Sequence, residues 1–221
     1  MLREALRRWW IAPAVCVPAL LALGGAGVGF SDAGFSARSA NPANSFQAAS
    51  SFCAGTRTVV ASADAWVSGE SKTSNFGTDL NIWSRAGAET SRTLVKFALP
   101  STGTCTVSSA TLRLYAGSVT STDGAVRTLQ AFQVGAAWAE TTVTWNTQPA
   151  TTGTAATTTS AAGWRSWDVG TQVQAMYSGA NNGFLVRDSS ETGGAQRWFS
   201  RFDSRENTNK PQLVITLTAS P

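Results

Sequence analysis

Alternation of apolar and polar residues along much of the chain predicts β-strands. In residues 213–217 every second residue is a large aliphatic, so one face of a strand would be apolar while the other carries Val and Thr. Residues 110–115 alternate in the same way, with Leu112 and Leu114 on the apolar face. Both segments predict strands that turn one face toward a core.

The rest of the chain contains further short runs rich in β-branched and aromatic residues, separated by Gly, Pro, Asn and Ser. These runs predict strands at residues 58–60, 63–67, 80–83, 93–99, 128–134, 164–169 and 184–187, and a strand-like segment at 197–206. Residues 171–177 favour two helical turns that end at Ser-Gly. The Thr/Ala/Ser run at 151–162 has no periodicity and predicts a loop or an irregular sheet edge. About ten short strands, no internal repeat and one short helix predict an all-β fold, a jelly-roll β-sandwich.

Composition and charge fit one globular domain. Apolar residues make up 43% of the 221 residues, which is enough for a core, and charged residues make up only 14%. The net charge of the chain is +4, and three arginines and one glutamate in the first ten residues contribute part of it. The remaining chain is therefore only mildly basic. Without Lys/Arg runs, nucleic-acid binding is not indicated. Attraction to an acidic polymer stays open if the arginines cluster in space.

The chain contains no histidine, which excludes a Ser-His-Asp triad, a Cys-His pair and a His-ligated metal. Glycoside hydrolysis by two facing carboxylates stays open in principle, but the spacing of the glutamates singles out no pair, and we do not expect an enzyme. No cofactor is indicated. A structural calcium ion remains an alternative because carboxylate oxygens are available. The candidate calcium ligands are Asp64, Asp79, Asp168 and Asp188.

Residues 1–29 have the features of a secretory signal peptide: a basic start, a short apolar stretch and a glycine-rich exit, with cleavage expected after Gly29. An uncleaved anchor is the alternative, since the apolar run approaches the roughly 20 residues of a membrane span. Residues 30–56 predict a flexible arm. The start of this arm is similar to the export region of Gram-positive proteins of the TasA/camelysin type. We therefore expect an extracellular or cell-surface protein of a Gram-positive bacterium, whose sandwich domain covers residues 57–219.

The cysteine count predicts one disulfide. Cys16 lies in the apolar N-terminal segment, which leaves Cys53 and Cys105, too few for a thiolate zinc site. Two cysteines in an exported domain are expected to pair, because the compartment is oxidising. The bridge would tie the start of the domain to the turn before the strand at 110–115, and its expected role is stabilisation.

Seven motifs occur in a characteristic order between residues 58 and 218. They are Asp-Ala-Trp-Val at 64–67, Ser-Asn-Phe-Gly at 74–77, Leu-Val-Lys-Phe at 94–97, Ala-Thr-Leu-Arg-Leu-Tyr at 110–115, the Trp/Thr-rich block 138–146 with Pro149, Asn-Gly-Phe at 182–184, and Ser-Arg-Glu at 204–206 with Pro-Gln-Leu at 211–213. In these motifs the chain resembles the DNRLRE domain family, part of which is classed as carbohydrate-binding module family 96. The family usually has Asp after the Lys/Arg-Phe pair, whereas Ala98 stands there in this chain.

The resemblance implies a jelly-roll β-sandwich of the kind found on exported and cell-surface proteins, often beside polysaccharide-active enzymes. Some members bind alginate, an acidic polysaccharide, and most have no assigned ligand. Within the motifs, we expect Trp138 and Trp145 to be core residues and Glu140 to hydrogen-bond a turn. Arg205 and Glu206 are expected to form a structural pair.

Arginines interleaved with aromatic residues are the candidate carbohydrate-binding site. A guanidinium group forks onto a carboxylate, and aromatic faces stack on sugar rings. The candidate residues are Arg187, Arg197, Trp198, Arg201, Arg113 and Arg85, with Arg187 expected on a strand that neighbours the one containing Arg201. The alternative is that these arginines only form ion pairs at sheet edges, for which the available acids are Asp188, Glu191, Asp203 and Glu206.

Three functions follow from the sequence. The first is a secreted or surface-attached, non-catalytic module that binds an acidic or cell-wall polysaccharide. The second is a structural cell-surface or matrix module without a glycan ligand, and the third is a polysaccharide-cleaving enzyme. The expected partner is a polysaccharide. A membrane would be contacted only through an uncleaved N-terminal segment.

Overall fold

The computed structural model describes residues 53–191, 195 and 197–220, which belong to one compact unit, Gln47–Pro221. The signal peptide, the alternative anchor and the arm up to residue 52 lie outside the described residues. In the part of the chain that is described, no helix has both the length and the apolar character needed to cross a bilayer.

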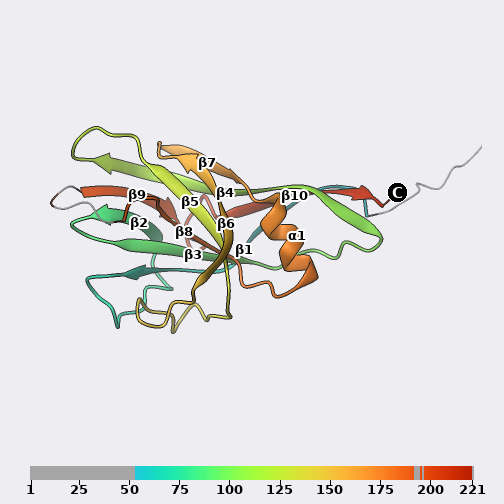
Figure 1. Ribbon diagram of the computed structural model, residues 1–221, viewed down its shortest axis with the longest axis horizontal. Coiled ribbons are helices and arrows are strands. Elements are labelled where there is room, and N and C mark those ends of the chain that lie inside the picture. The colour runs from blue at the N-terminus through green and yellow to red at the C-terminus, as the bar shows by residue number, and fades with distance from the viewer. Residues whose placement is uncertain (1–52, 192–194, 196, 221) are drawn as a thin grey trace, which may run out of the picture. The chain divides into compact units, whose positions relative to one another are not determined.

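The described residues contain ten strands and one short helix, which are connected by turns and loops (Figure 1). They are β1 (Gly55–Ser68), β2 (Asn81–Gly87), β3 (Ser91–Phe97), β4 (Cys105–Ser121), β5 (Thr128–Val134), β6 (Thr151–Thr159), β7 (Gly163–Asp168), α1 (Gly170–Ser178), β8 (Phe184–Asp188), β9 (Arg197–Asp203) and β10 (Gln212–Ala219). The all-β sandwich with one helix that the sequence predicts is therefore confirmed.

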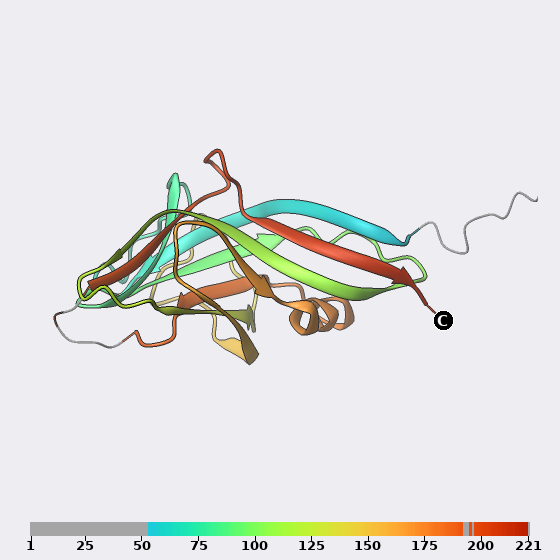
Figure 2. The same cartoon turned by 90° about the horizontal axis from the view of Figure 1, so that it is seen from above.

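Two long strands, β1 and β4, change partners along their length, so that the strands form one continuous hydrogen-bonded sheet. The first half of β1 pairs with β10 and its second half pairs with β3, with a bulge at residues 61–63. Strand β4 pairs first with β10 and later with β9, and β7 lies beside its middle. Figure 2 shows β1, β10 and β4 running alongside one another. The remaining strands follow in the order β9-β2-β3-β8-β5-β6.

The main core lies between β2, β9, β4 and β7 on one side and β3, β8 and β5 on the other. Ile82, Leu112, Leu114, Trp167 and Phe202 come from the first group and Val95, Phe97, Leu129, Phe184 and Val186 from the second. The Trp167 indole N–H crosses the core and donates to the carbonyl of Leu129 at 3.0 Å. Because the indole N–H is satisfied in this way, the large ring is buried without a lost hydrogen bond.

A second apolar cluster covers the other face of β1, β3, β8 and β5. This second cluster is formed by residues of these strands and by residues of the segment that links β5 to β6. Its members are Ala65, Val67, Leu94, Val134, Val143 and Leu185, with the partly buried Trp138 and Trp145. The indole N–H of Trp138 donates to the carbonyl of Asn182 at 2.8 Å. The two tryptophans of the 138–146 motif are thus packed against the sheet, as predicted.

The strand predictions agree closely where the apolar pattern is strong. The prediction at 128–134 coincides with β5, and the predicted helix lies within α1. The separate strands at 58–60 and 63–67 are one continuous β1, because the bulge changes the partner without ending the strand. The aperiodic run at 151–162 contains β6, a strand that ends the sheet. The segment at 197–206 leaves the strand after Asp203 and turns, with the Asn207 N–H donating to Ser204.

The predicted disulfide is present between Cys53 and Cys105. Its Cα atoms are 5.7 Å apart and the two residues are separated by 52 positions in the sequence. The bridge joins the segment before β1 to the first residue of β4. These are the strands that flank β10, so the disulfide ties together that end of the sheet.

Candidate functional site

The outward side of β2 and β9 carries alternating arginine and aromatic residues. Trp83 pairs with Arg201, Arg85 pairs with Phe199, and Gly87 pairs with Arg197 across the two strands. The residues between them are buried in the core, as the period of two in a strand requires. We call the set Trp83, Arg85, Arg197, Phe199 and Arg201 the arginine–aromatic face. Serine and threonine of β4 continue it, since Ser118 and Thr120 pair with Arg201 and Phe199.

Aromatic rings hold the guanidinium groups of this face in place. The ring of Trp83 meets that of Phe199 edge-on, with centroids 5.4 Å apart. The Arg85 guanidinium lies 4.2 Å from the Trp83 ring centroid and 5.2 Å from that of Trp66. Arg201 lies 5.9 Å from the same Trp83 centroid. Cation–π contacts of this kind restrict the arginine side chains, so that less conformational entropy is lost when they bind a ligand.

A shallow depression of about 160 Å³ lies within the arginine–aromatic face. Its lining is formed by residues of β2 and β9 and by Glu89 from the turn after β2, namely Trp83, Arg85, Ala86, Glu89, Arg197, Trp198 and Phe199. The Glu89 carboxylate accepts a hydrogen bond from Arg85 at 2.9 Å and lies 3.3 Å from Arg197. Two arginines from different strands thus converge on one carboxylate. The Arg197 side chain is nonetheless 63% exposed, so it is accessible to a ligand.

Trp198, a sequence-predicted site residue, is among the residues that line the depression, but its side chain is buried on the opposite side of β9. It is only 8% exposed. Its indole N–H donates to Asp123 at 2.7 Å, and the guanidinium of Arg127 lies 4.1 Å from its ring centroid. Alternation along β9 places Phe199, and not Trp198, on the same side as Arg197.

Arg113 lies on the outward side of the same sheet, in a separate group with residues of β7. Its guanidinium is 4.7 Å from the ring centroid of Trp164 and donates to the side chain of Gln212 at 3.1 Å. Tyr115 contacts Trp164 edge-on, with centroids 5.5 Å apart. This second aromatic–arginine group lies beside the part of β4 that pairs with β7, next to the part of β4 that pairs with β9.

Arg187 lies on another part of the fold. Strand β8 pairs with β3 and β5, whereas β9 pairs with β2 and β4, so the expectation that Arg187 and Arg201 lie on neighbouring strands is wrong. Arg187 packs over Phe132 at 4.7 Å and lies 3.6 Å from Glu191. Both oxygens of Glu191 are already bound by Arg92, each at 2.6 Å. The contacts of Arg187 are therefore those of a structural ion-pair group.

Arg205 is the centre of a structural network that joins three family motifs. Its Nε and Nη2 donate to the two oxygens of Glu140 at 2.7 and 3.0 Å, and its Nε also lies 3.0 Å from Glu206. The backbone N–H of Arg205 donates to Oδ2 of Asp64 at 2.6 Å. The backbone N–H of Asp64 in turn donates to Glu140 at 2.8 Å. The predicted pair of Arg205 with Glu206 is present, but the bidentate partner is Glu140.

Asp64 is the ionisable group in this network with a strongly altered pKa. Burial raises the pKa of Asp64 from 3.8 to about 7, against the hydrogen bond from the Arg205 backbone, which lowers it. The negative charges of Glu206 and Glu140 raise it further. A carboxyl group with this pKa is partly protonated near neutral pH.

The Ser-Asn-Phe-Gly motif fixes the segment that carries Glu140. The side-chain amide of Asn75 donates to the carbonyls of Glu140 and Val143 at 2.8 and 2.7 Å. A Cβ atom on Gly77 would collide with the carbonyl oxygen of Glu140, so the close approach requires glycine. Phe76 stacks on Trp66 with centroids 4.0 Å apart, and Trp66 contacts Arg85. The motif thereby supports one edge of the arginine–aromatic face.

The candidate calcium ligands are dispersed among different partners. Asp64 accepts from Arg205, Asp79 from the Trp66 indole, Asp168 from Gly170 and Asp188 from Arg127. Among the described residues, no group of three or more His, Cys, Asp or Glu residues is arranged to hold a metal ion.

The partly exposed arginine–aromatic face offers guanidinium donors beside flat apolar rings, a combination that can hydrogen-bond and stack on a sugar. Comparison with protein families agrees: the model for carbohydrate-binding module family 96 matches residues 55–217, which span nearly the whole sandwich. The chain therefore belongs to carbohydrate-binding module family 96. Modules of this kind are typically non-catalytic, which fits the expectation from the sequence. A search among curated proteins gives no match.

Four residues of the depression were not singled out by the sequence, namely Trp83, Ala86, Glu89 and Phe199. Phe199 had a signal, because it shares the period of two with Arg197 and Arg201. Trp83 had the same kind of signal, because it stands two residues before Arg85, and Glu89 follows Arg85 by four residues. The sequence did not show that β2 pairs with β9, which brings these residues to Arg197.

Proposed function

We propose that the protein is a non-catalytic module that binds a carboxylate-bearing polysaccharide through the arginine–aromatic face. The observation that carries the proposal is the convergence of Arg85 and Arg197 on a single carboxylate, that of Glu89, beside Trp83 and Phe199. Because these donors already hold one carboxylate, they have the spacing needed to hold the carboxylate of a uronic acid.

Recognition would combine charge and stacking. The carboxylate of a uronate accepts from Arg85 and Arg197, and the apolar face of the sugar ring lies on the aromatic rings between them. Arg85 is held against Trp83 before the ligand arrives, which lowers the entropic cost of binding. The depression is shallow and opens on a sheet surface, and this geometry suits the side of an extended polysaccharide chain.

Glu89 occupies the position proposed for the ligand carboxylate and should compete with it. Replacing Glu89 with Gln removes the negative charge and leaves a side chain of similar size. Ion pairs at a protein surface contribute about 0.2–1 kcal/mol, so Glu89→Gln is expected to tighten binding of a uronate polymer by about 1.4- to fivefold. Isothermal titration calorimetry with a uronate oligosaccharide measures this change. Weaker binding by the variant would show that Glu89 positions the arginines instead of competing.

A glycan array with a salt titration tests the proposal itself. The full-length protein is expected to be retained by uronate polymers such as alginate and polygalacturonate, and retention should weaken between about 50 and 500 mM NaCl because the charges are exposed. The double variant Arg85→Ala/Arg197→Ala should lose about tenfold or more in affinity, since each arginine provides charge-assisted hydrogen bonds.

The matched control is Arg57→Ala/Lys210→Ala, which removes the same charge from exposed residues outside the arginine–aromatic face. This control should keep its affinity apart from a small salt-dependent loss. If both double variants weaken binding equally, the attraction is a general effect of net charge and the proposed face is wrong. If no glycan retains the protein, the structural cell-surface module becomes the better explanation.

We also propose that the protein is exported and acts outside the cell or on its surface. The support is the signal-peptide pattern of residues 1–29 together with the Cys53–Cys105 disulfide, a bond typical of oxidising compartments. Expression in a Gram-positive host, followed by N-terminal sequencing of protein from the medium and the cell wall, tests this. A new N-terminus near residue 30 is expected, and full-length protein confined to the cytoplasm would contradict it.

A further inference from the structure

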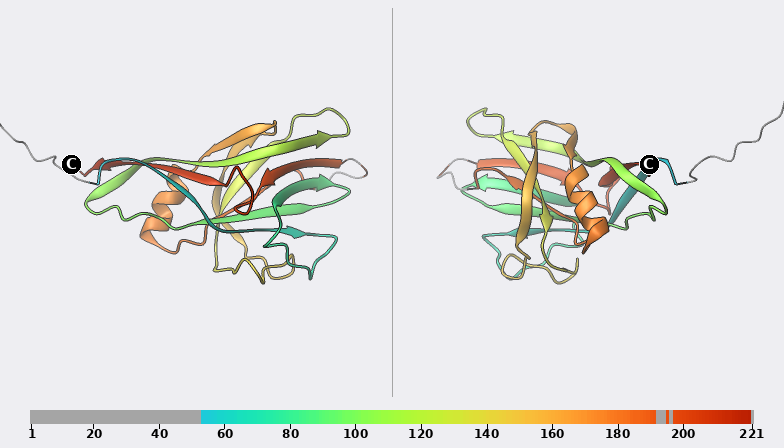
Figure 3. Two further views of the ribbon diagram at one scale, coloured as in Figure 1. Left: turned by 180° about the vertical axis from the view of Figure 1, so that it is seen from behind. Right: turned by 45° about the vertical axis from the view of Figure 1, so that its right-hand side comes forward.

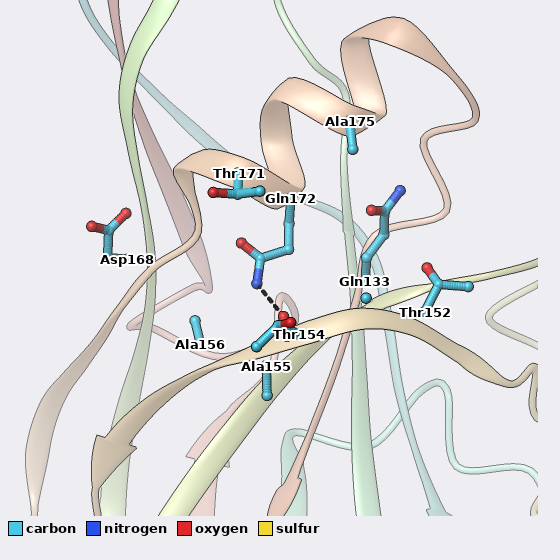
Figure 4. Close-up of a pocket in the computed structure, with 10 residues that line it drawn as sticks. Gln133, Thr152, Thr154, Ala155, Ala156, Asp168, Thr171, Gln172 and Ala175 are labelled. Carbon is cyan, nitrogen blue, oxygen red and sulfur yellow. Dashed lines mark hydrogen bonds between the residues drawn. The ribbon is translucent and has the colours of Figure 1, made fainter.

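A pocket of about 580 Å³ lies between helix α1 and strand β6, and it shares no lining residue with the arginine–aromatic face. Figure 3 shows α1 and β6 side by side, and Figure 4 shows the pocket between them. A volume of this size lies within the range of small-ligand pockets in proteins, about 300–1,000 Å³. The pocket can therefore accept a group as large as a sugar residue.

Strand β6 departs from regular pairing with β5 beside the pocket. Ala131 pairs with Ala156, whereas Gln133 pairs with Thr152, so β6 uses more residues than β5 over the same interval. Gly153 in this bulge has a φ of 69°, a conformation that favours glycine. The side-chain amide of Gln172 donates to the carbonyl of Thr154 at 2.9 Å and links α1 to the bulge. The bulge forms part of the pocket wall, and the hydrogen bond from Gln172 to Thr154 connects it to the helix.

The lining is rich in neutral hydrogen-bonding groups. Hydroxyls come from Thr152, Thr154 and Thr171, amides from Gln133 and Gln172, and methyl groups from Ala155, Ala156 and Ala175. In Figure 4 the hydroxyl and amide side chains lie around one space, with Asp168 at one end and Gln133 and Thr152 at the other. Neither an arginine or lysine nor an aromatic residue is among the lining residues.

Asp168 supplies the charge of the pocket. One of its oxygens, Oδ1, accepts the N–H of Gly170 at 3.1 Å at the start of α1, and the residue is exposed. A carboxylate without a neighbouring cation in the lining repels an anionic sugar, and its second oxygen can accept hydrogen bonds from hydroxyl groups. This chemistry is opposite to that of the arginine–aromatic face.

We propose that this pocket is a second carbohydrate site that binds a neutral, hydroxyl-rich sugar residue. Threonine hydroxyls and glutamine amides both donate and accept hydrogen bonds, as sugar hydroxyl groups do, and Asp168 selects against uronates. The protein then has two sites of different specificity, one for a carboxylate-bearing chain and one for a neutral sugar. Each site can fail in experiment without the other.

Amide-resolved NMR titration of the full-length protein tests the second site. The probes are glucose, galactose, mannose, N-acetylglucosamine and cellobiose, with sodium glucuronate as the acidic comparison. At least one neutral sugar is expected to shift the amide signals of Thr154 and Thr171. Glucuronate should shift them at least tenfold less at the same concentration.

Two variants separate binding in the pocket from other effects. Ala175→Trp places a large ring into the pocket from an exposed helix position and should weaken neutral-sugar binding at least tenfold. Ala180→Trp adds the same ring at an exposed residue outside the pocket lining and should leave binding unchanged. Asp168→Asn keeps an acceptor for the Gly170 N–H but removes the charge, and should reduce the discrimination against glucuronate.

The proposal is overturned if none of the neutral sugars shifts the pocket amides, or if Ala175→Trp binds the sugar as well as Ala180→Trp does. Preferential binding of glucuronate at these amides would also overturn it. The variant Arg85→Ala/Arg197→Ala should retain neutral-sugar binding. That result distinguishes failure of this site from failure of the arginine–aromatic face.

Discussion

Replacing Asp64 with Asn should change how the free energy of unfolding depends on pH. The Asp64 side chain is 1% exposed and accepts the backbone N–H of Arg205 at 2.6 Å. Burial raises its pKa from 3.8 to about 7. The folded protein therefore holds a proton on this carboxyl at pH values at which the unfolded chain has lost it.

The sign and size of the effect follow from this difference. Between about pH 4 and pH 7 the folded state binds more protons than the unfolded state, so stability falls as the pH rises through this window and levels off above it. A shift of about three pH units corresponds to at most about 4 kcal/mol. In Asp64→Asn the amide oxygen can still accept the Arg205 N–H, while no charge has to be buried. The variant should thus match the wild type near pH 4 and exceed its stability above pH 7.

Urea unfolding followed by tryptophan fluorescence at several pH values from 4.5 to 8.5 measures the effect. The chain has no histidine, so few other groups titrate in this window. The matched control is Asp123→Asn. Asp123 is exposed, and hydrogen bonds from Ser121 and Trp198 lower its pKa to about 2, so it titrates outside the window. The control should keep the wild-type dependence on pH whatever its overall stability.

Two results would refute the reasoning. A wild-type protein whose stability is constant between pH 5 and pH 8 would show that Asp64 ionises normally in the fold. An Asp64→Asn variant that keeps the wild-type slope would assign the titration to another group.

Other predictions concern the covalent and hydrogen-bonded ties of the sandwich. Removing the disulfide by Cys53→Ser/Cys105→Ser should lower the free energy of unfolding, measured by urea unfolding, by roughly 4 kcal/mol. The wild type under reducing conditions should lose a similar amount. A variant as stable as the oxidised wild type would contradict a stabilising role. Arg205→Lys loses the bidentate contact with Glu140, and because Arg205 is partly exposed, a loss of about 1–2 kcal/mol is expected in the same assay. Gly77→Ala should lower the free energy of unfolding by more than about 2 kcal/mol or prevent folding. In the control Gly69→Ala the new Cβ meets only ordinary van der Waals contacts, so the loss should be smaller. Similar melting temperatures for the two variants would contradict the close approach at Gly77.

Local patterns were sufficient for most of the strands. The alternation at 213–217 predicts which side chains of β10 are buried, and Leu213, Ile215 and Leu217 are indeed in the core. A strand imposes a period of two on its own side chains, so this information is present in consecutive residues. The run at 151–162 carried no such signal, because its apolar alanines do not alternate with its polar threonines and serines. Strand β6 forms there through backbone pairing with β5.

The candidate site was only partly predictable. Residue types indicated that arginine and aromatic side chains form a binding face, and Arg85, Arg197 and Arg201 do lie together. Arg187 does not belong to that face, and Trp198 lines the depression while its indole lies on the other side of β9. The direction of the Trp198 side chain follows from alternation along β9, which the sequence contains, whereas the position of Arg187 follows from strand order, which the sequence does not contain.

The fold class, the disulfide, the family resemblance and the kinds of side chain available for binding could all be predicted from the amino-acid sequence. These depend on composition, on cysteine number and on periodicity within single strands. The tertiary structure alone decided which side chains meet. Strand order and register bring Glu89 between Arg85 and Arg197, place Glu140 on Arg205, and open the pocket between α1 and β6. Apart from Arg85 and Glu89, which are four positions apart, the residues that meet are far apart in the chain, and no local pattern specifies which strands become neighbours.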